Sequence, residues 1–258
     1  MYIDSHCHLH MLKLDNYSGD LSALIDQASS VGVEHILCVG TTLEDSKVAI
    51  RVAEQFPHVT ASVGIHPSEK PEREPTIDTL AELASHPKVL AIGETGLDYH
   101  YNDSGLDVMR ERFRTHISAA KQLQKPLIIH SRDAREDTMN ILREEDAKSV
   151  GGVMHCFTES WEMAQEALAI DFYISISGIV TFKKAGNVAI VAEKTPLEKL
   201  LIETDAPFLA PVPFRGKQNE PQYVHFVAEK IAELKGLSVE EVAKATTTNF
   251  KRLFGPTA

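Results

Sequence analysis

The sequence predicts an α/β protein, a (β/α)8 TIM barrel formed by a single domain over residues 1–258. Eight short apolar segments alternate with helix patterns, as expected for a barrel of parallel strands. The chain length of 258 residues matches the roughly 250 residues that such a barrel needs. Metal-ligating residue types recur at the ends of the predicted strands, on the face where barrel active sites lie.

The eight predicted strands are rich in Val and Ile and show little alternation, which is typical of strands buried on both faces. They cover residues 2–6, 35–39, 59–65, 89–93, 127–130, 152–155, 172–176 and 199–204. The alternative is an open doubly wound sheet, which usually has a glycine-rich turn after its first strand. Residues 6–10, which follow the first strand here, contain no glycine.

Helix patterns separate these strands. Thr42 is the expected cap of one helix, Thr158 of the helix that contains Trp161, and Ser238 begins a capping box for a last helix that runs to about residue 254. Two apolar stripes at helical spacing are Leu21, Leu24, Ile25, Ala28 and Val31, which end before Gly32, and Met109, Phe113, Ile117 and Ala120.

The composition excludes several classes of protein. The formal net charge is −11, so the chain lacks the broad basic surface of a passive nucleic-acid binder. No apolar run approaches the roughly 20 residues that cross a bilayer, so we expect no membrane association. Three cysteines indicate no disulfide framework, and residues 1–6 do not resemble a signal peptide, so we expect a cytoplasmic protein.

Histidines and carboxylates end or follow most of the predicted strands, and a barrel brings these ends to one face. Side chains alternate along a strand, so His6 and His8 should point to the same side, with Cys7 packed toward the helices. By the same argument Glu203 and Asp205 should share a face. The full set is His6, His8, His66, Glu94, His130, His155, Glu203 and Asp205.

Such a cluster of carboxylates and imidazoles predicts divalent metal ions, which relieve the repulsion among the acidic groups. A catalytic zinc ion usually takes three protein ligands, so two ions that share a bridging carboxylate fit the count better than one. Four histidines favour Zn²⁺, Mn²⁺, iron or Ni²⁺, whereas Mg²⁺ prefers oxygen ligands. We expect purely structural roles for His10, His35, His58, His86, His100, His116 and His225.

Eight motifs, in order along nearly the whole chain, support a family resemblance. They are IDSHCHL (3–9), GIHP (64–67), IGETGLDY (92–99), IHSRDA (129–134), MHCF (154–157), SGIVTFK (177–183), ETDAPFLAP (203–211) and RGKQNEP (215–221). With these motifs the chain resembles the TatD-type metal-dependent deoxyribonucleases of the amidohydrolase-like barrel superfamily. That family is associated with magnesium-dependent 3′ to 5′ exonuclease activity, mainly on single-stranded DNA, in DNA repair and DNA degradation.

The resemblance implies a role for each site residue. His6, His8 and Asp205 would hold one metal ion, His130 and His155 the other, and Glu94 would bridge the two. His66 and Glu203 would be active-site residues that bind no metal. The substrate would be DNA with a single-stranded 3′ end, with no obligate protein partner.

The implied reaction is phosphodiester hydrolysis by water that the two metals activate, with Asp205 as the base and His66 beside a phosphate oxygen. Glu159 and Gln218 stand where relatives often have glycine and arginine, which makes the rim of the site less basic. The cations expected to contact phosphates are Arg132, Lys183, Arg215 and Lys217.

Two other functions stay open. The first is another barrel metallohydrolase that cleaves an amide, a lactone or a small phosphoester. Glu94 stands where some amidohydrolases have a carboxylated lysine, which speaks against several of those groups. The second is a binding protein without activity, but unpaired carboxylates and imidazoles at strand ends are costly to keep without metal.

Overall fold

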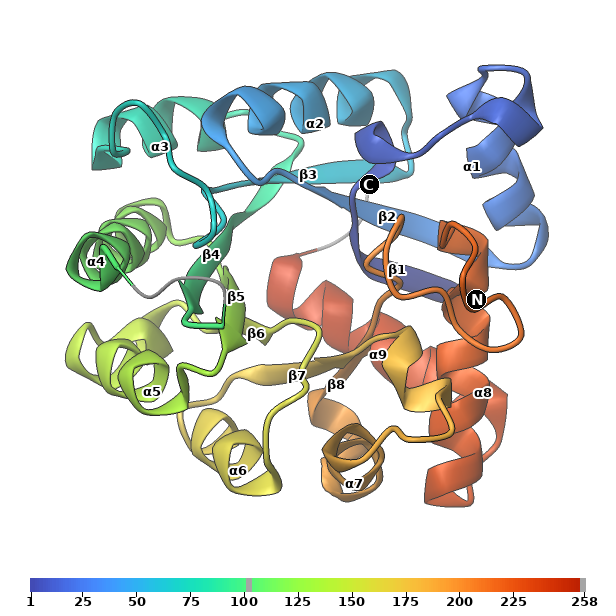
Figure 1. Ribbon diagram of the computed structural model, residues 1–258. Coiled ribbons are helices and arrows are strands. Elements are labelled where there is room, and N and C mark those ends of the chain that lie inside the picture. The colour runs from blue at the N-terminus through green and yellow to red at the C-terminus, as the bar shows by residue number, and fades with distance from the viewer. Residues whose placement is uncertain (101–103, 256–258) are drawn as a thin grey trace.

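A computed structural model describes residues 1–100 and 104–255 of the chain. Eight parallel strands form one sheet in the order β1 to β8, and helices surround it (Figure 1), so the predicted TIM barrel is confirmed. The strands are β1 (Tyr2–Cys7), β2 (Val33–Val39), β3 (Val59–Val63), β4 (Val89–Asp98), β5 (Leu127–Arg132), β6 (Gly152–Met154), β7 (Tyr173–Ile176) and β8 (Leu200–Ile202).

The helices alternate with the strands and cover the outside of the barrel (Figure 1). They are α1 (Leu21–Ser30), α2 (Leu43–Gln55), α3 (Ile77–Ala84), α4 (Leu106–Leu123), α5 (Arg135–Glu144), α6 (Trp161–Ala169), α7 (Asn187–Lys194), α8 (Val224–Lys235) and α9 (Val239–Phe254). Short 3-10 helices include η1 (Leu9–Met11) and η4 (Gly178–Thr181), which follow β1 and β7. No helix in the described ranges is long and apolar enough to cross a membrane, and the cytoplasmic location stays a prediction.

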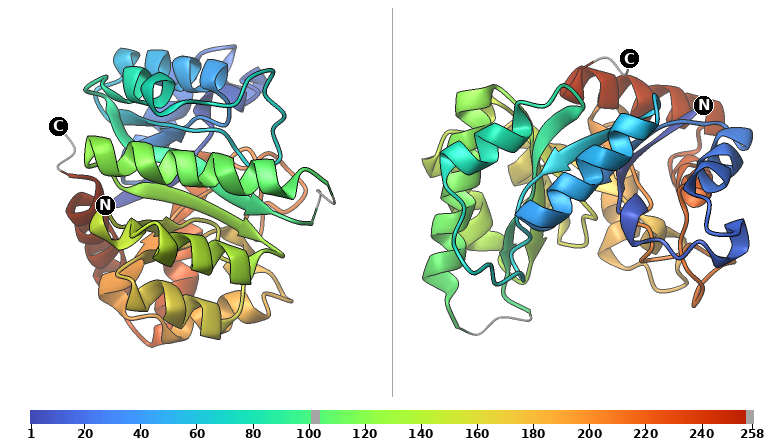
Figure 2. Two further views of the ribbon diagram at one scale, coloured as in Figure 1. Left: turned by 90° about the vertical axis from the view of Figure 1, so that its left-hand side faces the viewer. Right: turned by 90° about the horizontal axis from the view of Figure 1, so that it is seen from above.

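Helix α9 closes one end of the barrel. Phe250 and Phe254 of this helix pack into the apolar cluster inside the strands, whose other members are Ile3, Leu37, Val39, Ala91, Ile128, Val153, Tyr173 and Leu201. The amino terminus lies beside α9 (Figure 2), and Thr247 of this helix donates a hydrogen bond to the Met1 carbonyl. Because α9 fills the amino-terminal end of the barrel, the open end is the one where the carboxyl ends of the strands meet.

Side chains join β1 to β8 where regular pairing is sparse. In the described part of the chain, a single bridge between Cys7 and Ala206 is the backbone pairing at this seam. Asp4 is fully buried there and accepts hydrogen bonds from the Thr204 amide at 2.8 Å and from its hydroxyl at 2.5 Å. Asp4 therefore holds the segment that contains Glu203 and Asp205 against β1.

A β-bulge in β1 sets the direction of its histidines. Asp4 pairs with Ile36 and Cys7 with Cys38, so β1 has one more residue than β2 between these pairs. The extra residue lets Ile3 and His6 both point into the barrel although they are three positions apart. Cys7 packs among the residues between strands and helices, as predicted.

Strands β4 and β5 are longer than predicted, so Glu94 and His130 lie within strands and not at their ends. A second bulge, between Ile92 and Thr95, lets β4 continue to Asp98 alongside β5. Gly93 and Gly96 allow this close approach, because a Cβ on Gly96 would lie 2.0 Å from the His130 carbonyl oxygen. The bulge has no pattern in the sequence, and the strand predicted there covers only residues 89–93.

Most of the predicted helix features are confirmed. Thr42 caps α2, and Ser238 and Glu241 form the capping box of α9. Thr158 is not the cap of α6: the Ser160 side chain accepts the hydrogen bond from the first turn of that helix. Val31 follows the end of α1 and is partly exposed, so the apolar stripe of that helix ends earlier than predicted.

Candidate metal centre

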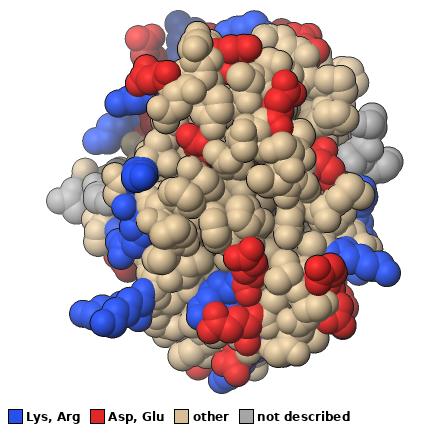
Figure 3. All heavy atoms as spheres, turned by 90° about the vertical axis from the view of Figure 1, so that its right-hand side faces the viewer, with Lys and Arg blue, Asp and Glu red and all other residues tan. Residues whose placement is uncertain are grey.

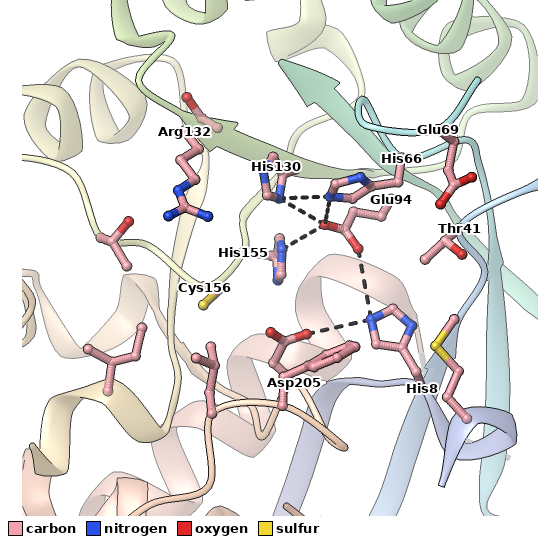
Figure 4. A pocket seen from close by; sticks show the side chains of 16 residues that line it. His8, Thr41, His66, Glu69, Glu94, His130, Arg132, His155, Cys156 and Asp205 are labelled. Carbon is pink, nitrogen blue, oxygen red and sulfur yellow. Dashed lines mark hydrogen bonds and ion pairs between the residues drawn. The ribbon is translucent and has the colours of Figure 1, made fainter. Parts of the chain in front are cut away.

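A cavity of about 860 Å³ opens where the carboxyl ends of the strands meet (Figure 4). Segments from around the whole barrel line this cavity, which is why residues 200 positions apart in sequence come together. Its lining residues are His8, Met11, Thr41, His66, Glu69, Glu94, His130, Ser131, Arg132, His155, Cys156, Thr158, Ile179, Asp205, Phe208 and Leu209.

A first group of donor atoms joins β1, β4 and the segment after β8. His6 Nε2 lies 3.4 Å from His8 Nε2 and 3.3 Å from Glu94 Oε2. Asp205 Oδ1 lies 3.7 Å from His6 Nε2 and 3.5 Å from His8 Nε2. These four side chains therefore place two nitrogens and two oxygens around one point.

The other oxygen of Glu94 faces a second group. Glu94 Oε1 lies 2.9 Å from His155 Nε2 and 3.1 Å from His130 Nδ1. His66 Nε2 lies near the same oxygen, at 3.4 Å, and 3.3 Å from His130 Nδ1. The Glu94 carboxylate thus stands between the two groups, with one oxygen directed to each (Figure 4).

Hydrogen bonds behind three of the histidines fix which nitrogen has the proton. His8 Nδ1 lies 2.9 Å from the Val39 carbonyl oxygen, and His155 Nδ1 lies 3.2 Å from Glu203 Oε1. Carbonyl and carboxylate oxygens accept hydrogen bonds, so each of these nitrogens donates. In the neutral form of both rings, Nε2 then has its lone pair directed toward the cluster, as a metal ligand must.

His130 follows the same rule with its ring reversed. Its Nε2 atom lies 3.0 Å from Asp98 Oδ2 and donates to it, which leaves the lone pair of Nδ1 directed at Glu94. Asp98 is fully buried, four residues after Glu94 on β4.

His66 has the opposite arrangement. Its Nδ1 atom accepts a hydrogen bond from the Ser68 amide at 3.1 Å, so Nε2 holds the proton in the neutral ring. Nε2 is the atom that faces Glu94 and His130. The geometry therefore makes His66 a hydrogen-bond donor to the cluster, whereas His8, His130 and His155 present lone pairs.

Burial and charge act against each other at these groups. Burial raises the pKa of Glu94, but nearby His155 and His66, with hydrogen bonds from His130 and His155, hold this pKa well below its usual value. Burial lowers the pKa of His155, but Glu94 and Glu203 raise it well above its usual value. Burial lowers the pKa of His66 to about 4, so this ring is neutral at neutral pH.

The donor set fits divalent metal ions. In the first group the nitrogen and oxygen atoms lie 3.3–4.0 Å apart. Donors that surround an ion tetrahedrally at about 2.1 Å lie about 3.4 Å from one another, which is close to this spacing. His6 Nδ1 is buried without a hydrogen-bond partner, so the position of this ring depends on what its other nitrogen binds. Nitrogen and carboxylate donors together are typical ligands of divalent ions.

Glu203 lies behind the donor cluster. It is completely buried, does not line the cavity, and accepts hydrogen bonds from His155 and from the Cys156 amide at 2.7 Å. Strand β8 ends at Ile202, so the alternation argument that placed Glu203 and Asp205 on one face does not apply to them. Cys156 and Asp205 both have left-handed backbone conformations, with φ of 43° and 58°, which other contacts must hold in place.

The predicted phosphate contacts are only partly brought together. Arg132 lines the cavity, but Lys183, Arg215 and Lys217 are exposed and do not line it. The Arg215 guanidinium lies over the Phe182 ring, 4.0 Å from its centre. On the face that Figure 3 draws, Lys and Arg stand in separate groups among Asp and Glu. Glu159 and Gln218, the two departures, bond to the backbone amides of Asp133 and Lys13.

Sequence reasoning missed the groups that orient the ligands: Asp4, Asp98, Thr204 and the Val39 carbonyl. Asp98 had a detectable signal, because it follows Glu94 by an even number of residues in one strand and so shares its face. The bond from His8 to a backbone carbonyl has no sequence signal. The seven histidines expected to be structural do not line the cavity, and several have partners elsewhere: His10 pairs with Asp45, His86 with Glu54, and His116 with the Ile65 amide.

Known proteins share this fold and much of this sequence. The family model described as TatD related DNase matches residues 3–255. The uncharacterized metal-dependent hydrolase YabD of Bacillus subtilis is 47% identical over 255 residues, which are 98% of this chain and 99% of the relative. The 3′-5′ ssDNA/RNA exonuclease TatD of Escherichia fergusonii is 35% identical over 250 residues, 95% of this chain and 96% of that protein.

Solved structures agree with these matches. The TatD homolog YjjV of Escherichia coli superposes with a TM-score of 0.91 at 29% identity, over 99% of this chain and 98% of that chain. A TatD family hydrolase of Entamoeba histolytica has a TM-score of 0.86 at 23% identity, over 99% of this chain and 98% of that chain, which shows the common fold. With the family match over nearly its whole length, the chain belongs to the TatD-related DNase family of metal-dependent hydrolases.

Proposed function

We propose that the protein is a metal-dependent 3′ to 5′ exonuclease that hydrolyses the phosphodiester bonds of single-stranded DNA. The observation that carries the proposal is the Glu94 carboxylate, which directs one oxygen to each of two donor groups at the mouth of the barrel. The name of the Escherichia fergusonii relative, 3′-5′ ssDNA/RNA exonuclease TatD, supports the substrate class. Because that name includes RNA, we also expect activity on single-stranded RNA.

We assign two divalent ions to the donor groups. His6, His8 and Asp205 would hold one ion, His130 and His155 would hold the other, and Glu94 would contribute one oxygen to each. When bound, such ions lower the pKa of water and neutralise charge on the phosphate oxygens. Mg²⁺ is the ion we propose for activity, and the four imidazoles also suit Zn²⁺, Mn²⁺ or Ni²⁺.

Residues of the chain supply the proton transfer and the positioning. Burial raises the pKa of Asp205, but the hydrogen bond with His8 and the nearby His6 and His155 lower it below its usual value, so the carboxylate is ionised and accepts the proton of the attacking water. His66 donates from Nε2 to a phosphate oxygen, the role that its neutral ring and the Ser68 bond support. Arg132 contacts phosphate from the cavity wall.

Four further residues act at a distance from the reacting atoms: Glu203 and the exposed cations Lys183, Arg215 and Lys217. Glu203 positions His155 through the hydrogen bond to its Nδ1 atom. We therefore propose a positioning role for Glu203 and not the role in the reaction that the family resemblance implies. The three exposed cations lie in the loops that follow β7 and β8. They contact phosphates of the bound DNA that are further from its 3′ end.

The test is digestion of a 5′-labelled single-stranded oligodeoxynucleotide by metal-loaded protein, with a duplex, an RNA and a strand blocked at its 3′ end as comparisons. We expect a ladder that shortens from the 3′ end, release of mononucleotides, and no reaction on the blocked strand or after chelation. A parallel panel of lactones, amides and small phosphoesters tests the alternative. Turnover of that panel without digestion of any nucleic acid would overturn the nuclease proposal.

A further inference from the structure

The cavity has two chemically different walls. Thr41, His66, Glu69, Ser131 and Arg132, which follow or end β2, β3 and β5, supply polar groups on one side. The other side is formed by η1, η4 and the segment after β8, and its apolar members are Met11, Ile179, Phe208 and Leu209. Because β1, β7 and β8 are neighbours in the barrel, these four apolar side chains line the same side of the cavity, beside the donor cluster.

Phe208 is the most exposed member of that wall. Its surface is 53% accessible, although a large aromatic side chain is normally buried. The ring lies edge-to-face with His8, with ring centres 6.1 Å apart. An uncovered aromatic ring therefore stands directly beside a group of metal-ligating side chains.

The backbone holds Phe208 firmly in this position. The Phe208 amide donates to the Asp205 carbonyl at 2.9 Å, and the Val212 amide donates to Thr181 Oγ1 at 2.9 Å. Gly178 approaches so closely that a Cβ there would lie 2.2 Å from the Leu209 carbonyl oxygen. The loop is thus packed against η4, and its backbone holds Phe208 at the cavity before a ligand binds.

We propose that Phe208 stacks on the base of the 3′-terminal nucleotide while the phosphate of that nucleotide lies at the donor cluster. This inference rests on the proposed function and adds a base-binding subsite to it. In a nucleotide, a base with an apolar face lies next to a charged phosphodiester. This arrangement matches an apolar wall next to a metal centre. Stacking uses the face that every base has, so the subsite accepts all four bases.

Tyr99, an aromatic residue that directly follows β4, is not equivalent. Its hydroxyl donates to Asp137 at 2.5 Å and accepts from Arg110 at 2.9 Å, and it does not line the cavity. These bonds tie Tyr99 to α4 and α5, so Phe208 is the aromatic residue that the cavity offers to a base.

The experiment compares two single-stranded oligodeoxynucleotides that differ only in their 3′-terminal nucleotide, which has a base in one and a tetrahydrofuran abasic analogue in the other. We expect wild-type protein to prefer the base-bearing strand in kcat/KM by about 5- to 150-fold, the range that one base stack provides. Phe208→Ala should reduce this preference to less than about threefold, and Phe208→Trp should retain it. Ile190→Ala, which removes an exposed apolar side chain on α7, is the matched control and should leave the preference unchanged.

Binding of both strands to metal-loaded protein, measured by fluorescence anisotropy with a 3′-terminal linkage that resists hydrolysis, gives a readout that does not depend on hydrolysis. The same ratio of affinities is expected, and the same loss in Phe208→Ala. Equal preference in wild type and Phe208→Ala, by either readout, would overturn the subsite even if both strands are digested. If neither strand is digested while the binding preference persists in wild type and disappears in Phe208→Ala, the exonuclease proposal fails and the base-binding subsite stands.

Discussion

Glu94 Oε1 lies 2.9 Å from His155 Nε2, inside the barrel and almost without solvent exposure. The second oxygen of the same carboxylate lies 3.3 Å from His6 Nε2. One side chain on β4 thus links histidines from β1 and from the end of β6. Its negative charge is the common element of both donor groups, which makes Glu94 the residue on which the metal proposal depends most directly.

Replacement of Glu94 by glutamine should keep the fold, lower metal content and abolish hydrolysis. An amide of the same shape has no charge to offset two cations. Elemental analysis gives the metal content, and digestion of single-stranded DNA gives the activity. Glu54→Gln, on the exposed face of α2, is the matched control and should behave as wild type. Two fully occupied metal sites in Glu94→Gln would contradict the bridging role.

Alanine at His130 or His155 should reduce activity by orders of magnitude, because each substitution removes a metal-facing lone pair. Alanine at His58 or His86 should leave activity unchanged, since neither lines the cavity and His86 pairs with Glu54. Digestion rates measured at saturating metal, with melting temperatures to confirm folding, compare the two groups. Equal losses of activity in the two groups of variants would show that a histidine's position in the cavity does not identify it as a metal ligand.

Glutamine at Glu203 tests a positioning role. The change keeps an oxygen for the Cys156 amide but weakens the bond that orients His155, so metal affinity should fall by roughly 10- to 100-fold. Competition with a chelator measures this affinity, and excess metal should restore much of the activity. Unchanged affinity with activity lost at saturating metal would instead place Glu203 in the chemical step.

His116 should make the metal-free protein less stable in mild acid. This buried ring accepts from the Ile65 amide and donates to the Arg112 carbonyl, and burial lowers its pKa to about 4. In the unfolded chain the pKa of this imidazole returns to its usual value of about 6.5. Between these values the unfolded state binds a proton that the folded state does not, so the free energy of unfolding decreases as pH falls.

His116→Gln keeps a donor and an acceptor without this titration. Relative to the variant, wild type should lose up to about 1.4 kcal/mol of unfolding free energy per pH unit between about pH 6.5 and 4. Urea unfolding in chelator at several pH values measures this, with His86→Gln as the exposed control. A constant difference between wild type and His116→Gln across this range would contradict the assignment.

The order of strands and helices could be predicted because each element has its own local pattern. The positions of His6, Glu94 and Asp205 at one mouth followed from the barrel alone, since parallel strands bring their carboxyl ends together. The bulges in β1 and β4 could not be predicted, because each depends on the register with the neighbouring strand. Because of the bulge in β1, Ile3 and His6 both point into the barrel. Because of the bulge in β4, this strand extends to Asp98.

The groups behind the ligands were also beyond sequence reasoning. The Val39 carbonyl and the Ser68 amide belong to the backbone, and which histidine they contact depends on the folded loops. These bonds separate His8, which presents a lone pair, from His66, which presents a proton. The same limit applies to the rim cations, where Arg132 reaches the cavity and Arg215 lies over Phe182.

A chain of net charge −11 should hold DNA through few phosphate contacts. Among the four rim cations considered, Arg132 lines the cavity while Lys183, Arg215 and Lys217 are exposed outside it. Each phosphate of a single strand that is neutralised contributes roughly −0.7 to the slope of log affinity against log salt concentration. We expect about two to four such contacts, so the slope should lie between about −1.4 and −2.8. Anisotropy titrations across a range of salt concentrations measure this slope.

Arg215→Ala or Lys217→Ala should weaken binding equally for all sequences, because phosphate contacts position a strand without reading its bases. Removal of metal should cost more affinity than either substitution, since bound divalent ions are the largest local charges in such a site. A steep slope that survives chelation would point to an extended basic groove. That result would contradict a rim with few phosphate contacts. It would leave the assignment of the metal ligands untouched, because that assignment depends on the donor atoms around Glu94 and not on the rim.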